Sequence, residues 1–168
     1  MNPGENIPSP APRQLTDADR PKILRFFLDH WGANIIVSRG RVHHAKTLEG
    51  FLLENEGEIE ALITCHVDKE ELEIVTLDSL RENRGAGTVL MECAVEKARA
   101  LNCRRVWLIT TNDNTRAIRF YQRRGFDLVA VHRNAMEEAR RLKPQIPLTG
   151  FDGLPIRHEV EFELVLTP

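Results

Sequence analysis

Two glycines stand where a strand would pass into a helix, in the segment Arg84-Gly-Ala-Gly-Thr88. Gly85 and Gly87 let the backbone approach a ligand closely and accept positive φ. We expect Thr88 to begin a helix, whose first amides and dipole would favour a bound anion. Because Gly-x-Gly before a helix also occurs as a plain tight turn, this motif alone leaves both interpretations open.

The turn matches neither of two familiar nucleotide-binding motifs. A P-loop requires Gly-Lys-Ser/Thr, and this turn has no lysine. The dinucleotide fingerprint requires a third glycine, but Leu90 occupies that position. An anion would therefore be bound in another way.

A second motif follows one strand–helix unit later. Its pattern Asn-x-x-Ala-x-x-x-Tyr-x-x-x-Gly-Phe is made by Asn114, Ala117, Tyr121, Gly125 and Phe126. Together with the glycine turn, it resembles the GNAT family of acyl-CoA-dependent N-acyltransferases over residues 50 to 131. The tail from Pro144 to Arg157 also resembles a bacterial subgroup of that family.

One residue departs from the family pattern. Glu82 stands where the family usually has Gln or Arg, three residues before the first glycine. A carboxylate near a pyrophosphate disfavours binding. Because backbone amides do the binding, we expect the site to survive with weaker affinity for CoA.

The resemblance implies a fold and a cofactor site. The fold is α/β: a mixed, mostly antiparallel sheet with a splayed parallel strand pair and helices on both faces. The pantetheine arm of acetyl-CoA would lie between the splayed strands, and the glycine turn would hold the pyrophosphate. The implied cofactor-binding residues are Val75, Thr76, Leu77, Asn83, Arg84, Gly85, Ala86, Gly87, Thr88, Asn114, Ala117 and Phe120.

The resemblance also implies that Tyr121 is the general acid. A phenol with a pKa near 10 can protonate a CoA thiolate with a pKa near 9 at little energetic cost. The alternative is a half-buried tyrosine that packs beside Phe120. An amide N–H near Leu77 is expected to polarise the thioester carbonyl.

The reaction also requires a general base that accepts a proton from the attacking amine. Glu73 lies on the strand that leads to the acyl site, and we favour it. Glu71 shares its strand face, Asp78 lies at the strand end, and His66 has a suitable pKa. All four stay open, because strand glutamates more often face solvent.

The N-terminal half should supply one helix and several strands. A helix should start near Thr16 or Asp19, bury Ile23, Phe27 and Trp31 at four-residue spacing, and stop at Gly32. Residues 34–38 should form a strand, and residues 58–67 should belong to a three-stranded antiparallel meander.

The segment 39–49 reads as a polar loop. It contains His43 and His44, for which we favour a solvated position. The alternative is a ligand for a metal or a substrate carboxylate, but no third ligand stands at a recognisable spacing. We expect no bound metal.

The C-terminal part ends in an alternating strand, residues 158–166. Its acidic face, with Glu159, Glu161 and Glu163, is most simply solvated; turned toward the acyl site, it would favour a cationic amine. Before it, loop 143–157 contains three prolines and two glycines. We interpret this loop as a wall of the acceptor site.

Composition limits the remaining classes. The length of 168 residues suggests a disordered tail, 1–13, followed by a single domain, 14–168. A net charge of −2 does not favour nucleic acid, and no apolar run suggests a membrane span or a secretory signal. Three cysteines without Cys-x-x-Cys favour free thiols in a reducing cytoplasm.

The first hypothesis is thus an acetyl-CoA-dependent N-acetyltransferase. A non-catalytic acyl-CoA-binding module and a purely structural domain are the alternatives. The acceptor stays open among small amines, amino acids, antibiotics, peptide N-termini and protein lysines. An exposed sheet edge would also allow a homodimer.

Overall fold

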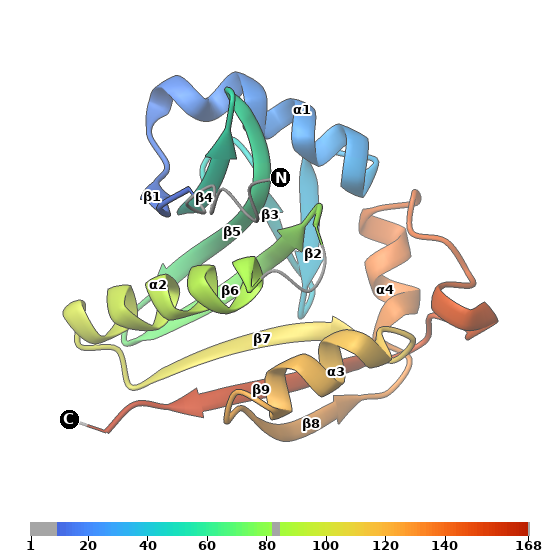
Figure 1. Cartoon of the computed structure of the whole chain (residues 1–168). Coiled ribbons are helices and arrows are strands. Elements are labelled where there is room, and N and C mark those ends of the chain that lie inside the picture. The colour runs from blue at the N-terminus through green and yellow to red at the C-terminus, as the bar shows by residue number, and fades with distance from the viewer. Residues whose placement is uncertain (1–9, 82–84, 168) are drawn as a thin grey trace, which may run out of the picture.

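The computed structural model describes residues 10–81 and 85–167. In this part of the chain, seven strands form one sheet in the order β1-β4-β5-β6-β7-β9-β8, and β2 and β3 form a second sheet (Figure 1). The strands are β1 Arg13–Gln14, β2 Ile35–Ser38, β3 Arg41–His44, β4 Glu49–Asn55, β5 Glu58–Asp68, β6 Glu71–Ser79, β7 Arg105–Thr111, β8 Asp127–His132 and β9 Glu159–Val165. The helices are α1 Arg20–Trp31, α2 Ala86–Ala100, α3 Thr115–Gln122 and α4 Ala135–Leu142, with 3-10 turns at Asp17–Asp19 and Phe151–Gly153.

The large sheet is mixed, as predicted. Strands β4, β5 and β6 form an antiparallel meander, and β6 and β7 are parallel because α2 crosses between them. Strand β9 pairs antiparallel with both β7 and β8. The expected fold class is confirmed.

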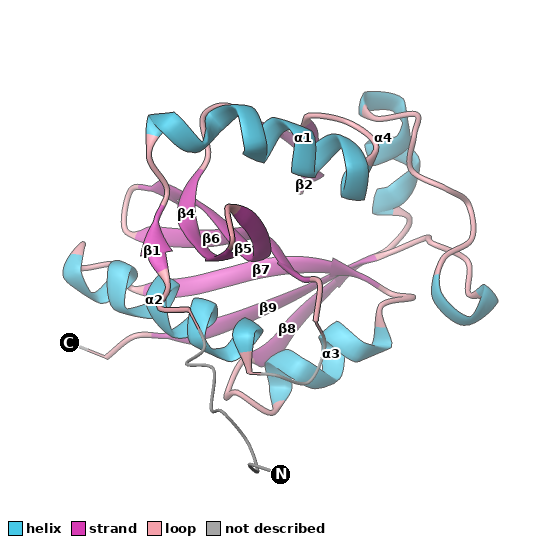
Figure 2. Ribbon diagram, turned by 45° about the horizontal axis from the view of Figure 1, so that its top comes forward, coloured by secondary structure: helices cyan, strands magenta, loops and turns pink. Residues whose placement is uncertain are grey.

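Helices cover both faces of this sheet. Figure 2 shows α1 above the sheet and α2 and α3 below it. Side chains alternate along β4, so Leu52 packs in the cluster that includes Phe27, and Leu53 packs in the cluster that includes Leu90. Each face therefore has its own hydrophobic core.

Helix α1 agrees with the prediction except in its last turn. Pro21 lies in the first turn, and Gly32 ends the helix with φ 71°. Trp31, expected to be buried, is 37% exposed, and Phe26 is buried instead. The buried positions of the helix are Ile23, Phe26 and Phe27, and the last turn lies outside the core. Trp31 instead contacts Asp78 near the end of β6.

Arg13, predicted to belong to a disordered tail, lies in strand β1. Arg13 pairs with Leu52 of β4, and its guanidinium donates hydrogen bonds of 2.8 Å to both carboxylate oxygens of Asp19. This contact lowers the pKa of Asp19. The prediction of disorder is wrong for Arg13, and residues 1–9 lie outside the described residues.

The polar segment 39–49 is not a loop. Residues Arg41–His44 form β3, which pairs with β2 as a hairpin. His43 is buried at 4% exposure, so its predicted solvated position is wrong, whereas His44 is exposed. The hairpin packs on the large sheet, where His43 contacts Glu73 of β6. The polar composition of the segment does not predict this packing.

Smaller differences concern helix ends and cysteines. Helix α2 ends at Ala100, and Leu101, which follows it, is 50% exposed. Asn134 precedes α4 with φ 59° and makes no side-chain cap. All three cysteines are free thiols, as expected; Cys65 and Cys103 are buried, and Cys93 is partly exposed. Among the described helices, none is long and apolar enough to cross a membrane.

Gly50 provides a test of the strand packing. A Cβ at this position would lie 1.9 Å from the carbonyl oxygen of Ile63 on the neighbouring strand. Gly50→Ala should therefore force β4 and β5 apart and lower the free energy of unfolding by about 3 kcal/mol or more. Urea unfolding measures this loss.

The matched control is Gly40→Ala, in the β2–β3 turn. A Cβ there meets nothing within 4 Å, although φ is +73°. The control should lose only about 1 kcal/mol, from the left-handed backbone. Equal losses in the two variants would contradict the proposed clash.

Candidate active site

The parallel pairing of β6 and β7 is short. It joins Glu71–Ile74 to Arg105–Leu108, although β6 continues to Ser79 and β7 to Thr111. Beyond Ile74 and Leu108 the two strands separate: in Figure 1 the arrowhead of β7 points toward α4, whereas that of β6 points toward β2 and the end of α1. The predicted splayed pair is therefore present.

The separated part of β6 carries a bulge. On its other side, Thr76 pairs with Thr64 and Ile74 pairs with Cys65, which makes Val75 the extra residue. The edge of Val75–Ser79 that faces β7 is outside the ladder between these strands. Its N–H and C=O groups can bond an extended ligand as an added strand would.

The glycine turn leads into α2 as expected, with a shifted start. Gly85 adopts the left-handed conformation, φ 77°, and the helix begins at Ala86, two residues before the predicted start at Thr88. The amide of Val89 donates to the carbonyl of Gly85 at 3.1 Å. The amides of residues 86–88 precede this bond and have no acceptor within the helix, so they can bind an anion. Glu82, Asn83 and Arg84 lie outside the described residues.

Gly87 is required for packing, not for positive φ, so that part of the prediction is wrong. A Cβ on Gly87 would lie 3.3 Å from the Phe120 ring and 3.9 Å from Leu77. The bare backbone lets α2 approach α3 at this point. Three of the predicted cofactor residues thus meet at one end of the separated strands.

Arg124 belongs to this neighbourhood, and the sequence analysis missed it. Its guanidinium donates hydrogen bonds of 2.9 and 2.6 Å to the hydroxyl of Thr88 and lies 3.5 Å from the centre of the Phe120 ring. Burial and the neighbouring Arg123 lower its pKa. In the sequence Arg124 follows another arginine, Arg123, and nothing in the local pattern distinguishes the two.

Tyr121 is buried at 6% exposure on the face of the sheet that α2 and α3 cover. Its ring packs against Phe120, Phe126 and Phe162, with centroids 5.2, 5.5 and 6.2 Å away. Burial, followed by the nearby Asp78 and Cys65, raises its pKa. The phenol therefore keeps its proton at neutral pH and can donate it.

The three polar residues before α3, Asn112, Asp113 and Asn114, make different contacts. Asn114 caps the helix by accepting a 3.1 Å hydrogen bond from the amide of Ala117. The other two instead hold loop 143–157 and its end: Asn112 accepts from the amides of Arg157 and His158, at 2.8 and 2.9 Å, and Asp113 accepts from Phe151 at 3.1 Å. Asn and Asp are both good capping residue types, and of these three only Asn114 is the N-cap of α3.

Glu73 is buried at 3% exposure on the opposite face. Its Oε2 lies 3.1 Å from His43 Nε2, an ion-pair distance without hydrogen-bond geometry. The ring of His66 is 5.2 Å from that of His43. The hairpin thus brings one of the predicted loop histidines to the favoured general base.

The acidic face of β9 is not solvated, contrary to the simpler expectation. Glu159 is buried at 2% exposure. Arg105 binds Glu161 and Glu163 at 3.2 and 2.8 Å, and it also binds Glu71 at 3.1 Å. Glu71 is therefore engaged by a guanidinium, which disfavours it as the base.

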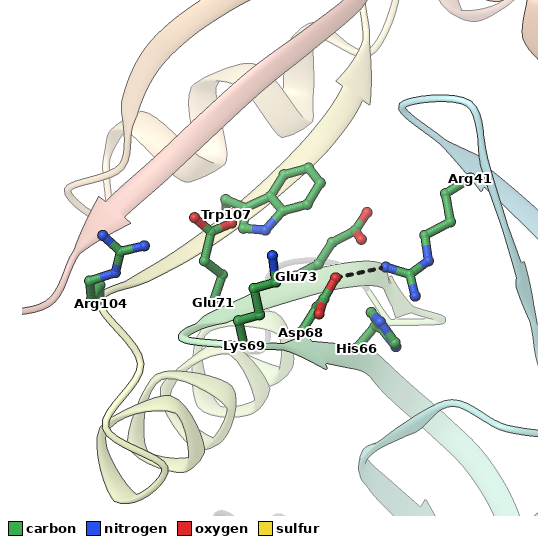
Figure 3. A pocket seen from close by; sticks show the side chains of 8 residues that line it. All are labelled: Arg41, His66, Asp68, Lys69, Glu71, Glu73, Arg104 and Trp107. Carbon is green, nitrogen blue, oxygen red and sulfur yellow. Dashed lines mark hydrogen bonds and ion pairs between the residues drawn. The ribbon is translucent and has the colours of Figure 1, made fainter.

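A pocket of about 320 Å³ opens beside the start of the parallel pair (Figure 3). In this view Glu73 lies between Trp107 of β7 and Arg41 of β3. None of the residues of loop 143–157, all of which are described, lines this pocket. The eight lining residues are Arg41, His66, Asp68, Lys69, Glu71, Glu73, Arg104 and Trp107.

The two other candidates for the general base are His66, on β5, and Asp78, near the end of β6. Burial and the charge of Arg41 lower the pKa of His66, which lines the pocket. Burial raises the pKa of Asp78 to about 6, and Trp31 Nε1 donates to its Oδ2 at 3.1 Å. Asp78 therefore stays a candidate beside Glu73.

Comparison with known proteins identifies the family. Residues 13–126 match the profile of the Acetyltransferase (GNAT) family, and the chain belongs to this family. The chain is 46% identical over 142 residues to the uncharacterized protein YdhI of Bacillus subtilis (strain 168), covering 84% of this chain and 89% of that protein.

Two solved structures have the same fold. An IAA acetyltransferase from Bacillus cereus ATCC 14579 superposes with a TM-score of 0.70 at 14% identity, covering 93% of this chain and 99% of that one. A Bacillus subtilis acetyltransferase in complex with CoA gives a TM-score of 0.66 at 17% identity, covering 94% and 99%.

The raised pKa of Asp78 predicts a pH effect on stability. Its ordinary value is 3.8, so the folded state binds a proton more tightly than the unfolded state, and stability falls as pH rises from about 4 to about 6. Asp78→Asn removes this loss and keeps an acceptor for Trp31. The stability of the variant relative to wild type should rise by about 1 kcal/mol between pH 5 and pH 7.5.

Urea unfolding at the two pH values measures this difference. Asp127→Asn, at an exposed position of β8, is the matched control for the substitution. The prediction is contradicted if the free energies of unfolding of Asp78→Asn and wild type differ by the same amount at both pH values. The pKa of Asp78 would then be the same in the folded and the unfolded chain.

Proposed function

We propose that the protein is an acetyl-CoA-dependent N-acetyltransferase in which Tyr121 is the general acid and Glu73 is the general base. The separation of β6 and β7 carries this proposal. It lies beside the first turn of α2, with the buried phenol of Tyr121 on the face covered by α2 and α3 and the buried carboxylate of Glu73 on the face covered by the β2–β3 hairpin.

The donor would bind along the separated strand. The backbone of Val75–Leu77 would bond the pantetheine amides, and the amides of residues 86–88 would hold the pyrophosphate. Asn114, with Ala117 and Phe120, would contact the pantetheine arm, and Arg124 adds a positive charge beside Thr88. The complex of the similar B. subtilis acetyltransferase with CoA supports this donor.

The reaction would proceed by direct transfer. The amine nitrogen attacks the thioester carbon while Glu73 accepts a proton from it, and an amide N–H near Leu77 polarises the carbonyl oxygen. The C–S bond then breaks, and Tyr121 protonates the departing thiolate. The phenol is protonated near neutral pH, but burial raises its pKa, so it gives up the proton less readily than an exposed tyrosine and the transfer to the thiolate costs more than the reference pKa values imply.

Binding of the donor is the first test. Acetyl-CoA at ~100 times its dissociation constant should stabilise the protein by ~2.7 kcal/mol, which is a rise of several degrees in Tm. Thermal unfolding with and without acetyl-CoA measures the shift. If neither acetyl-CoA nor CoA changed Tm, the protein would be a structural domain; a shift without acetyl transfer to any amine would favour a binding module.

Tyr121→Phe tests the general acid. Removal of the hydroxyl should slow acetyl transfer by on the order of 100-fold, because the thiolate would leave without its proton donor. The dissociation constant for CoA should stay nearly unchanged, since the ring still packs against its aromatic neighbours. Thiol release and isothermal titration measure the two effects.

Phe126→Leu is the control for aromatic packing, since Phe126 contacts the Tyr121 ring. This variant should lower stability and keep most of the turnover. If Tyr121→Phe lost CoA binding and stability together but kept its turnover number, Tyr121 would have a packing role only.

A further inference from the structure

Arg124 lies just after the end of α3 and is bound to the first turn of a different helix, α2. Its Nε and Nη2 donate hydrogen bonds to Thr88 Oγ1 at 2.9 and 2.6 Å. Its Nη1 donates to the backbone carbonyl of Phe120 at 3.0 Å. All three nitrogens of the guanidinium are therefore engaged, and the planar group is held in one orientation.

The ring of Phe120 fixes the same guanidinium from a second direction. The guanidinium carbon lies 3.5 Å from the centre of this ring. A Cβ on Gly87 would lie 3.3 Å from the ring, so α2 and α3 meet at this point. The position of Arg124 is thus tied to the first turn of α2 by hydrogen bonds and by packing.

The two bonds from Arg124 decide where the Thr88 hydroxyl can direct its proton. A hydroxyl has two acceptor lone pairs and one O–H donor. Arg124 donates twice to Thr88 Oγ1, and within the described part of the chain no hydrogen bond uses the O–H of Thr88. The O–H therefore points away from Arg124, and its proton is available to a ligand.

The place of Thr88 in α2 indicates which ligand this is. Gly85 is the N-cap of the helix, so Thr88 is its third residue. Side chains of a helix tilt toward its N-terminus, and the hydroxyl consequently reaches back toward the amides of residues 86–88. These amides have no acceptor within the helix. The O–H adds one side-chain donor to a group of backbone donors that suits an anion.

We propose that Arg124 is a positioning residue for the acyl donor: by donating twice to Thr88 Oγ1, it orients the Thr88 O–H as a hydrogen-bond donor to the pyrophosphate of acetyl-CoA. This inference rests on the proposed acetyltransferase function and adds two side chains to a site otherwise made of backbone amides. Arg124 acts through Thr88 and does not itself contact the phosphates.

The size of the effect follows from the charge of the acceptor. A hydrogen bond to a charged group typically changes an equilibrium constant by about tenfold or more. Because a cationic guanidinium donates to the hydroxyl oxygen, it also makes the O–H a stronger donor. Loss of either side chain should therefore weaken the same single bond to the pyrophosphate.

A double-mutant cycle with CoA tests this dependence. By isothermal titration, Thr88→Val and Arg124→Gln should each raise Kd by about tenfold, and the double variant should be no weaker than Thr88→Val. Thr88→Ser, which keeps the hydroxyl, should recover most of the affinity lost in Thr88→Val. Additive losses, about 100-fold in the double variant, would show that Arg124 contacts the ligand directly and would overturn the proposal.

Three ligands locate the phosphate concerned: CoA, dephospho-CoA and pantetheine. Dephospho-CoA lacks only the 3′-phosphate, and pantetheine lacks every phosphate. Thr88→Val and Arg124→Gln should weaken the first two ligands equally and leave the Kd of pantetheine, followed by ligand-observed NMR, unchanged. A loss confined to CoA would assign Arg124 to the 3′-phosphate. An equal loss for pantetheine would show a general distortion of the site, and either result would overturn the proposal.

Arg123→Gln is the matched control, because it removes the same charge from the exposed neighbouring residue. At physiological salt it should change the Kd of CoA by less than about twofold. A loss as large as that of Arg124→Gln would show attraction at long range and would contradict the positioning role. Circular dichroism without ligand checks folding. If Arg124→Gln does not fold, wild-type affinity for CoA in Thr88→Val alone would overturn the proposal.

Turnover separates this inference from the proposed function. With an amine that is acetylated, both variants should raise KM for acetyl-CoA and leave kcat unchanged, since the bond is the same before and during transfer. CoA binding without the dependence of Arg124 on Thr88 would remove this inference and leave the function standing. The predicted dependence without acetyl transfer to any amine would remove the function and leave the role of Arg124 standing.

Discussion

The short pairing between β6 and β7 is the constraint on which the rest of the structure depends. Backbone N–H and C=O groups are costly to leave unpaired away from water, so an interior strand edge needs something to bond. The pairing ends at Ile74 and Leu108, and the next residue of β6, Val75, forms a bulge. The α2 crossover then places the first turn of a helix at the same end of the gap.

The sheet divides the site into two environments with different chemistry. On the face covered by α2 and α3, aromatic rings surround Tyr121, and burial among them raises the pKa of the phenol. On the hairpin face, carboxylates and histidines surround Glu73, and Arg105 balances part of their charge. In the proposed reaction, the proton donor and the proton acceptor would therefore approach the acyl carbon from opposite faces of the sheet.

Elements distant in sequence complete these surroundings. The last turn of α1 leaves the core, and its Trp31 reaches Asp78 at the end of β6. Asn112 and Asp113, which follow β7, hold loop 143–157 through backbone amides. The interpretation of that loop as a wall of the acceptor site stays a proposal, since the pocket beside Glu73 is lined by other residues.

The sequence by itself determined the local elements and the family. Alternating and helical periodicity gave the meander, the crossover and both ends of α1, and the Gly85–Tyr121 motifs gave the family, because these signals depend on neighbouring residues. Only the tertiary structure decided which polar residues are buried. His43 and Glu159 read as solvated, since local sequence does not show that a hairpin covers a strand from the other end of the chain. The role of Arg124 could not be predicted either, because its contact with Thr88 joins residues 36 positions apart in the sequence.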